Sequence, residues 1–239
     1  MGAWDSSESR NHPVRDPSYI RTELDRHAIG QFLRVYGCEA WGVALNDPTL
    51  PFAPALPRAV SIVMHIDPRT LRGMRHGPTK EYQEEYHRLN DALDAATSAL
   101  VALLHDHSHE ALAVPATSES GEGFFPHKTA ATQAGLGWIG KTALFVSPDF
   151  GPAVRLATVF TDLELPAGEP VTEGRCGACR ACVDACPAGC GRDVDWRAGM
   201  PRDKLFDAPA CRHHMERSTA LETQICGMCI AACPLSRKD

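Results

Sequence analysis

The stretch CGACRACVDACP, residues 176–187, holds four cysteines, and a proline follows the last of them. A second run, CGMCIAACP at residues 226–234, repeats the ending of this pattern, and Cys211 lies fifteen residues before it. Nine of the ten cysteines fall between residues 176 and 233, whereas Cys38 stands apart. The start of the chain lacks the apolar core of an export signal, so the clustered cysteines indicate metal binding rather than disulfides.

The spacing of the first run is that of two-cluster bacterial ferredoxins, in which the cysteine before the proline binds the other cluster. Applied to this chain, the rule predicts two complete sets of ligands. One [4Fe-4S] cluster would be held by Cys176, Cys179, Cys182 and Cys233. The other would be held by Cys186, Cys211, Cys226 and Cys229. Cys190 is not a ligand in either set and would become one only if Cys186 does not bind. Cys38 is expected to be buried.

Zinc is the alternative metal for these cysteines. Structural zinc usually takes paired ligands in a closed tetrahedron, often two Cys-x2-Cys units. Three cysteines within seven residues, with a fourth before a proline, suit that arrangement poorly. The histidine-rich tract HDHSHE, residues 105–110, is a weak metal signal and is expected to form a solvated turn.

Composition limits the class of protein. At 239 residues, with 44% hydrophobic and 23% charged residues, the chain is an ordinary globular sequence that can bury a core. Its formal net charge of -6 and the lack of a long basic run argue against general nucleic-acid binding. No run approaches the ~18 apolar residues of a membrane span, so a cytoplasmic protein without membrane contact is expected.

The N-terminal part is predicted to be an α/β domain. Residues 1–16 are polar and expected to be disordered, residues 17–168 form the cofactor and substrate domain, and residues 169–239 form the double-cluster domain. Thr79 is the expected N-cap of a long helix, with Tyr82 and Tyr86 either in the core or reaching a ligand from its exposed end. Apolar spacing predicts further helices over 19–35 and 127–134, and strands over 40–45, 59–64, 111–115, 143–146 and 154–160.

The stretch GLGWIGKT, residues 135–142, matches the phosphate-loop pattern G-x-x-x-x-G-K-[ST], and its first six residues match G-x-G-x-x-G. Both motifs require a strand before them and a helix after them, so that amides at the helix start face the phosphates. Here a predicted helix precedes the stretch and a predicted strand follows it. We therefore interpret both matches as accidental.

Residues 127–162, HKTAATQAGLGWIGKTALFVSPDFGPAVRLATVFTD, together with the two cysteine runs, resemble the epoxyqueuosine reductase family and its reductive-dehalogenase relatives. The resemblance covers residues 126–239 and is weaker over GPTKEYQEEYHRLN, residues 77–90. The joint occurrence of the glycine-rich stretch and the double cysteine pattern is more specific than either feature alone.

The resemblance implies an α+β protein with a nitroreductase-like N-terminal domain and a two-[4Fe-4S] ferredoxin-like domain. It also implies a base-off cobalamin between the two domains, supplied with electrons by the clusters. Backbone at small residues can approach a flat macrocycle closely. The implied cofactor contacts are Gly135, Gly137, Trp138, Gly140, Lys141, His127 and Lys128. For Lys141, His127 and Lys128 an ordinary surface position is the alternative.

Two departures from the family affect the expected activity. The family's acidic proton donor would align near Gly121, so Glu119 and Glu122 become the candidate catalytic acids, with solvated loop glutamates as the alternative. The chain also stops five residues after Pro234, without the C-terminal helical-repeat region of the tRNA-modifying enzymes. This short form and the acidic balance argue against tRNA binding.

The resulting hypothesis is an iron-sulfur reductase that passes electrons from two [4Fe-4S] clusters to a cobalamin-type cofactor. The cofactor would then remove oxygen or halide from a small-molecule substrate. The electron donor would be a ferredoxin or a flavodoxin. The alternative is an electron carrier, or a reductive activator of a partner corrinoid protein, without a substrate of its own.

Overall fold

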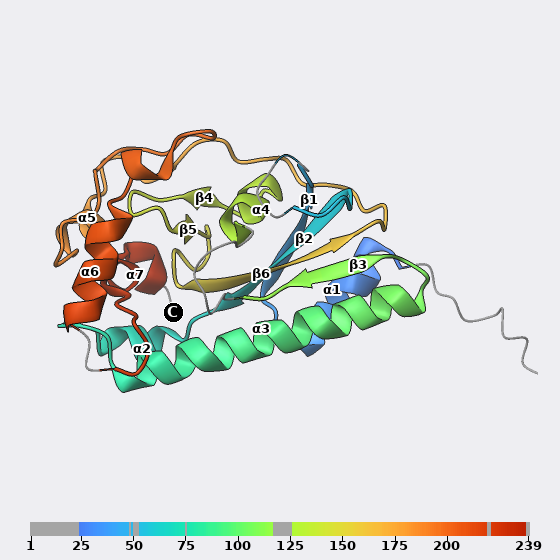
Figure 1. Ribbon diagram of the computed structural model, residues 1–239, viewed down its shortest axis with the longest axis horizontal. Coiled ribbons are helices and arrows are strands. Elements are labelled where there is room, and N and C mark those ends of the chain that lie inside the picture. Colours follow the sequence, from blue (N-terminus) through green and yellow to red (C-terminus); the bar gives the residue numbers. More distant parts are fainter. Residues whose placement is uncertain are drawn as a thin grey trace, which may run out of the picture.

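A computed structural model describes residues 24–47, 49, 53–74, 76–116, 126–218 and 221–237. The strands and the long helix α3 occupy the first two thirds of the chain, and helices joined by loops occupy the cysteine-rich remainder (Figure 1). The helices are α1 (Arg26–Val35), α2 (Pro68–Arg72), α3 (Lys80–Asp106), α4 (His127–Gln133), α5 (Ala181–Asp184), α6 (Ala208–Ser218) and α7 (Met228–Ala232). The strands are β1 (Ala40–Leu45), β2 (Arg58–His65), β3 (Ala111–Val114), β4 (Trp138–Ile139), β5 (Phe145–Val146) and β6 (Val154–Thr161). Two 3-10 turns are η2 (Arg202–Lys204) and η3 (Pro234–Arg237).

Four strands form one antiparallel sheet in the order β1-β2-β6-β3. The two central strands pair along their whole length, from Arg58 opposite Thr161 to His65 opposite Val154. Six of the eight residues in each of these strands are buried. A sheet whose central strands are buried on both faces must be covered by other elements on both sides.

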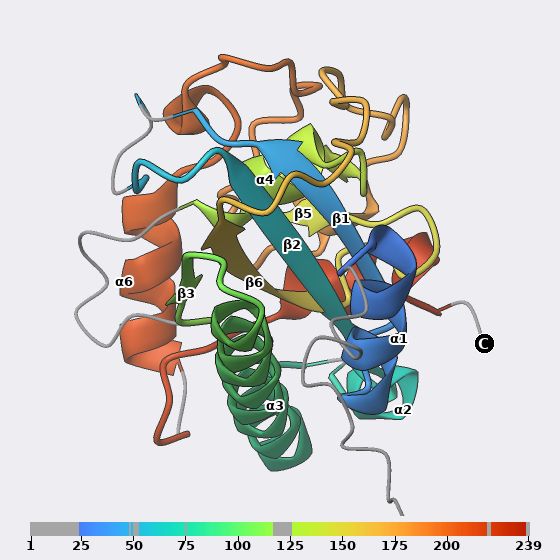
Figure 2. The ribbon, with the colours of Figure 1, turned by 90° about the vertical axis from the view of Figure 1, so that its right-hand side faces the viewer.

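Helices provide this cover, and Figure 2 shows the sheet between α4 on one side and α1 with α3 on the other. Val60 and Ile62 of β2 belong to the core formed with α1 and α3. On the opposite face, Ala130 and Ala134 pack with Phe160 of β6. Successive residues of a strand point to opposite faces, so each central strand serves both layers. The predicted mixed α/β fold is confirmed.

The long helix α3 runs for 27 residues, about 40 Å, beneath the sheet. It begins where the Thr79 side chain accepts a hydrogen bond from the backbone N–H of Tyr82, at 3.2 Å. Glu81 in its first turn lies where a negative charge favours the helix N-terminus. Its buried apolar stripe includes Leu89, Leu93, Ala96 and Leu100. The predicted cap and stripe are therefore confirmed.

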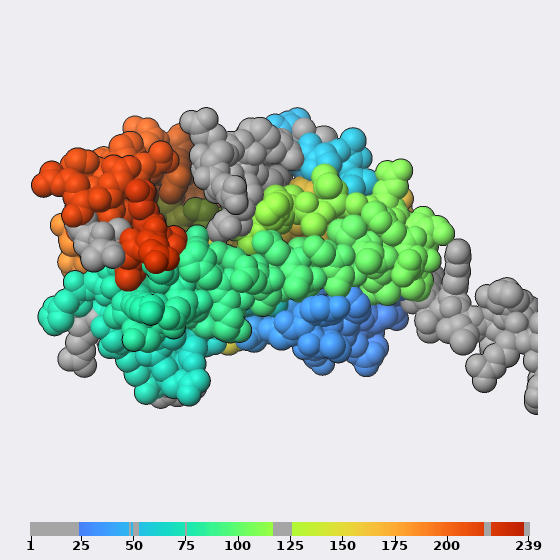
Figure 3. Space-filling view, turned by 60° about the horizontal axis from the view of Figure 1, so that its bottom comes forward, coloured from blue at the N-terminus to red at the C-terminus, as the bar shows by residue number. Residues whose placement is uncertain are grey.

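The cysteine-rich segment lies at the Lys80 end of α3 (Figures 1 and 3). Gly227, between Cys226 and Cys229, has a φ of 72°, and a Cβ there would lie 2.8 Å from the Tyr82 hydroxyl oxygen. Tyr82 is only 4% exposed, so this ring packs directly against the second cysteine run. Burial raises the pKa of Tyr82. Of the two roles considered for Tyr82, the structure shows the buried one.

The structure and the expected elements differ at the start of α1, at β5 and at β4. The helix expected over 19–35 is seen as α1 from Arg26, and residues 19–23 lie outside the described residues. The strand expected over 143–146 begins only at Phe145, because Ala143 has a φ of 55° and its N–H donates to the carbonyl of Gly140 across a turn. Its partner β4 was not predicted.

The order of elements around GLGWIGKT confirms that the phosphate-loop match is accidental. The helix α4 ends at Gln133, before the stretch, and the β4–β5 hairpin follows without a helix. Backbone amides at a helix start, which would bind phosphate, are therefore missing from this position. Within the part of the chain that the structure describes, no helix combines the length and the apolar character needed to cross a membrane.

Candidate metal centre and adjoining pocket

The fold brings together the four sulfurs predicted for the first cluster. Cys182 lies on α5, Cys233 directly follows α7, and the two helices pack against each other. Burial raises the pKa of Cys182, and the neighbouring groups of Cys176, Cys233 and Cys179 raise it further. Burial and then Cys176 and Cys179 likewise raise the pKa of Cys233. The last cysteine of the chain thus lies with the first run; the role of the four as ligands stays a prediction.

The four sulfurs predicted for the second cluster also interact with one another. Burial raises the pKa of Cys211, with further contributions from Cys226 and Cys186. Burial raises the pKa of Cys229 to about 12, and Cys226, Cys182 and Cys186 add to this. Cys186, from the first run, therefore lies with the second run, as the crossing pattern requires. We call these two sets of four the first and second sulfur groups.

The described side chains form no compact site for a single metal ion. Across the described ranges, no three cysteine, histidine, aspartate or glutamate side chains are close enough together to hold one metal ion. In a tetrahedral zinc site, Zn–S bonds of about 2.3 Å bring the sulfurs to about 4 Å from one another. In the histidine-rich tract, His109 Nδ1 instead lies 3.1 Å from Asp162 Oδ1.

The two remaining cysteines differ in their surroundings. Cys38 is buried between α1 and β1, and this burial raises its pKa to about 12. Cys190 is fully buried beside the second sulfur group, and its backbone N–H lies 3.4 Å from Cys186 Sγ. Burial and the Cys186 thiolate raise the pKa of Cys190 to about 12.

The β4–β5 hairpin faces the first sulfur group with side chains from the glycine-rich stretch. Trp138 Nε1 donates a hydrogen bond to Cys176 Sγ at 3.5 Å. A Cβ at Gly140 would lie 3.7 Å from the same sulfur and 2.9 Å from Val146 Cγ2. Thr142, which was not singled out in the sequence, is also buried, at 5% exposure.

The glycines of this stretch pack closely against the chain itself. A Cβ at Gly135 would lie 2.7 Å from the carbonyl oxygen of Glu169, and one at Gly137 would overlap the carbonyl oxygen of Val146. The space left by the missing side chains of these two glycines is therefore occupied by the protein's own backbone, whereas the sequence suggested room for a macrocycle. Whether they also contact a cofactor stays a prediction.

Lys141 holds the hairpin to the first cysteine run. Its side chain is buried, and Nζ donates to the carbonyl of Gly177 at 2.7 Å and to Asp193 Oδ1 at 2.9 Å. The hydrogen bond with Asp193 raises the pKa of Lys141. The alternative of an exposed surface lysine is wrong, because these two acceptors draw the ammonium inward. Its contact with a cofactor stays a prediction.

A pocket of about 330 Å³ opens between α4, β6 and α7. Its polar lining comes from His127, Lys128 and Arg155, and its apolar lining includes Phe145, Leu156 and Ile230. Because Ile230 follows Cys229 in the chain, the pocket adjoins the second sulfur group. Two of the implied cofactor contacts, His127 and Lys128, therefore line the same pocket as Arg155. Trp138 and Lys141, which were also implied contacts, do not line it.

Each polar residue of the pocket is held by a defined contact. Lys128 Nζ donates to the carbonyl of Ala143 at 2.7 Å, and burial lowers the pKa of Lys128 to about 8. Arg155 Nε donates to Asn90 Oδ1 at 2.9 Å, and the guanidinium lies 4.3 Å from the centre of the Tyr86 ring. The ordinary surface position considered for Lys128 is wrong. Glu119 and Glu122 lie outside the described residues.

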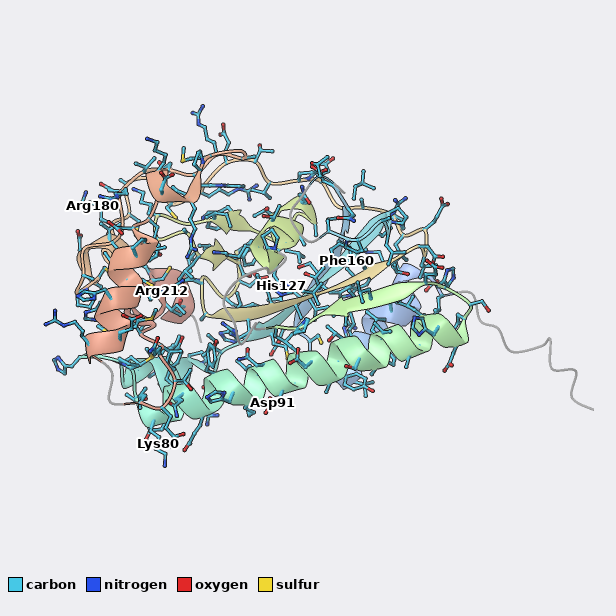
Figure 4. All side chains as sticks on the ribbon, in the orientation of Figure 1. Lys80, Asp91, His127, Phe160, Arg180 and Arg212 are labelled. Atoms are coloured by element: carbon cyan, nitrogen blue, oxygen red, sulfur yellow. The ribbon has the colours of Figure 1, made fainter. Side chains whose placement is uncertain are left out.

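His127 lies between α4 and the sheet (Figure 4) and is 8% exposed. Its Nε2 lies 3.0 Å from the carbonyl of Pro115, and its Nδ1 lies 2.8 Å from Thr158 Oγ1. A carbonyl only accepts, so Nε2 carries the proton of the neutral ring and Nδ1 accepts from the Thr158 hydroxyl. Burial lowers the pKa of His127 to about 4, so the surface alternative is wrong here too.

This burial predicts an acid-sensitive contribution to stability. The folded protein keeps His127 neutral down to a pH of about 4, whereas an exposed histidine protonates near its ordinary pKa of 6.5. The unfolded state therefore binds more protons between these values, and stability falls as the pH decreases from 6.5 to 4. In His127→Gln the pH dependence of the urea midpoint should be shallower over this window. Equal slopes in the two proteins would contradict the assignment.

The described residues form a mixed α/β fold joined to a cysteine-rich segment, and solved reductases have the same fold. A reductive dehalogenase described as B12-dependent aligns with a TM-score of 0.74, 19% identity, and coverage of 91% of this chain and 33% of that chain. Epoxyqueuosine reductase bound to a tRNA-Tyr stem loop aligns with a TM-score of 0.62, 18% identity, and coverage of 88% and 65%.

Sequence comparison gives the same two groups of proteins. Epoxyqueuosine reductase of Bacillus anthracis is 31% identical over 125 residues, 51% of this chain and 31% of the relative. Tetrachloroethene reductive dehalogenase of Dehalobacter restrictus is 34% identical over 120 residues, 46% of this chain and 22% of the relative. The chain thus spans about a third or less of these curated relatives. No protein-family model matches it. The resemblance to epoxyqueuosine reductases and reductive dehalogenases is confirmed.

Proposed function

We propose that this chain is the reductase part of an iron-sulfur enzyme that removes oxygen or halide from a small substrate. The observation that carries the proposal is the crossed arrangement of the cysteines. Cys176 and Cys179 act on the Cys233 thiol, and Cys186 acts on Cys211, Cys226 and Cys229, which supports two sets of four ligands. The similarity to proteins named epoxyqueuosine reductase and reductive dehalogenase supports the reductase class.

The donor set suits two [4Fe-4S] clusters. Each group offers four thiolates. A [4Fe-4S] cluster binds each thiolate at a separate iron, so the ligand sulfurs lie farther from one another than the sulfurs around one zinc ion. The corresponding architecture would be a nitroreductase-like domain over residues 17–168 and a ferredoxin-like domain over residues 169–239.

The two groups differ in their access to solvent, which suggests a direction for the electrons. Cys179 of the first group is exposed, whereas burial raises the pKa of Cys229 in the second group to about 12. Electrons from a ferredoxin or flavodoxin would therefore enter at the first group. The second group lies on the side of the pocket lined by Ile230, where a substrate or cofactor would be reduced.

The pocket residues fit a cofactor or substrate that presents anionic or hydrogen-bonding groups. Arg155 is a permanent cation, and Lys128, with a pKa of about 8, is protonated at neutral pH. His127 is neutral and fixed by its two partners, so it shapes the pocket rather than supplying charge. Cobalamin, when bound, would supply a strongly reducing metal centre. This choice is supported by the solved dehalogenase described as B12-dependent.

Removal of a halide consumes two electrons and one proton, because a hydrogen replaces the departing halide on carbon. Removal of an oxygen atom consumes two electrons and two protons, because the oxygen leaves as water. Glu119 and Glu122 are the proposed sources of these protons. A small molecule is proposed as the substrate, since a formal net charge of -6 gives no general attraction to a nucleic acid.

Anaerobic reconstitution with iron and sulfide tests the proposal. We expect about eight iron and eight sulfide per chain, because each of the two cubanes holds four of each. Added cobalamin should bind with about one equivalent and show the absorption of its base-off form. Iron without cobalamin uptake would favour the electron carrier or activator. Zinc in place of iron would overturn the proposal.

A further inference from the structure

The glycine-rich stretch directs the indole of Trp138 toward a cysteine of the first sulfur group. Trp138 lies on β4 and is 6% exposed, and its Nε1–H donates a hydrogen bond to Cys176 Sγ at 3.5 Å. An indole N–H can only donate, and burying it without an acceptor would cost free energy. The family resemblance implied that Trp138 contacts a cofactor, whereas the polar atom of its side chain faces a predicted cluster ligand.

The hairpin fixes the position of this donor. Trp138 on β4 pairs with Val146 on β5. A Cβ at Gly137 would overlap the carbonyl oxygen of Val146, so the two strands are in close contact at this point. The indole also packs in a buried apolar cluster that contains Trp196. The indole therefore cannot turn away from the sulfur without opening this packing.

The loop that carries the acceptor is fixed on both sides of Cys176. Before it, the backbone N–H of Gly174 donates to the carbonyl of Trp196 at 2.7 Å. After it, the carbonyl of Gly177 accepts a hydrogen bond from Lys141 Nζ at 2.7 Å. Because Lys141 belongs to the same hairpin as the indole, the donor and the acceptor are held on one rigid unit.

Hydrogen bonds to the sulfurs of an iron-sulfur cluster are among the features that set its reduction potential. Reduction adds negative charge to the cluster and its thiolates, and a hydrogen bond is stronger when its acceptor is charged. We infer that Trp138 is a hydrogen-bond donor that raises the reduction potential of the first cluster through Cys176. The second group has a donor of its own, since the backbone N–H of Cys190 lies 3.4 Å from Cys186 Sγ. The effect of Trp138 is therefore confined to the first cluster.

This inference rests on the proposed clusters, and redox titration of the reconstituted protein, followed by electron paramagnetic resonance, tests it. Trp138→Phe removes the N–H but keeps an aromatic ring. It should make reduction of the first cluster about tenfold less favourable, which lowers its potential by about 59 mV for a one-electron couple. The potential of the second cluster should not change. The same shift should appear when Trp138→Phe is combined with Cys226→Ala, which should retain the first cluster alone.

Trp196→Phe is the matched control, because Trp196 is a buried tryptophan of the same apolar cluster. Both of its potentials should equal those of the wild type. A second measurement needs no variant, and it decides the matter if Trp138→Phe does not retain the first cluster. Wild-type protein containing tryptophan labelled with ¹⁵N in the indole should show a ¹⁵N hyperfine coupling on the reduced first cluster. The Trp196→Phe protein, labelled in the same way, should keep this coupling.

The outcomes separate the role of Trp138 from the proposed function. An unchanged potential of the first cluster in Trp138→Phe, or an equal shift in Trp196→Phe, would overturn the inference and leave the reductase proposal standing. A labelled wild-type protein whose reduced first cluster shows no ¹⁵N coupling would do the same. Absence of any iron-sulfur signal from the reconstituted wild-type protein would overturn both.

Discussion

Replacing Cys233 with alanine is expected to lower the iron content of the reconstituted protein from about eight atoms per chain to about four. The lost cluster should be the one assigned to Cys176, Cys179 and Cys182, although Cys233 belongs to the second run in sequence. The reason is the crossed arrangement, in which Cys176 and Cys179 are the neighbours that raise the pKa of Cys233. Iron and sulfide analysis with the spectrum of the dithionite-reduced protein measures the effect.

Comparison variants make this result specific. Cys233→Ala should reproduce the residual spectrum and reduction potential of Cys176→Ala, and should differ from Cys226→Ala, which removes the other cluster. Cys38→Ala should keep about eight irons, because Cys38 is buried between α1 and β1. A Cys233→Ala protein that matches Cys226→Ala would mean that each run holds its own cluster, and the ligand sets would have to be reassigned.

Replacing Gly137 with alanine is expected to destabilise the protein by about 2–3 kcal/mol. The added Cβ would overlap the carbonyl oxygen of Val146 and would lie 2.7 Å from Phe145 Cζ, so the two strands of the hairpin must move apart. For a chain of this size the melting temperature should fall by roughly 4–12 °C. Thermal unfolding followed by circular dichroism, at matched cluster content, measures the change.

Gly73→Ala provides the control for this substitution. Gly73 ends α2 with a φ of -75°, and the nearest atom to an added Cβ is Thr79 Cγ2, at an ordinary contact distance of 3.6 Å. Its melting temperature should change by no more than a degree or two, within the range of surface substitutions. If Gly137→Ala were equally harmless, the hairpin would be less tightly packed than the structure shows. The role of the hairpin in positioning Trp138 beside Cys176 would then lose its basis.

Features that depend on local chemistry could be predicted from the sequence. Thr79 was expected to cap α3, and its side chain does accept from the Tyr82 amide. Long apolar runs predicted the central strands β2 and β6, because strands buried on both faces are apolar throughout. The cysteine spacing predicted that Cys233 and Cys186 would exchange partners. The groups that act on Cys226 and Cys233 agree with this exchange, and the ligand sets stay a prediction.

Features that depend on distant contacts could not be predicted. Ala143 begins an apolar run typical of a strand, yet it adopts a positive φ because the hairpin turns there. Lys141 was expected either at a cofactor or on the surface. Its neighbours in the sequence give no sign of the hydrogen bond to Asp193, which lies 52 residues away. Glu119 and Glu122 remain predictions.

The position of Cys233 also has a consequence for biosynthesis. Under the proposed assignment, a nascent chain that contains Cys176, Cys179 and Cys182 supplies three ligands of the first cluster. The fourth ligand, Cys233, is synthesised about fifty residues later. The second cluster waits too, until Cys226 and Cys229 have left the ribosome. Both metal insertions are thus postponed until the α/β part has been translated.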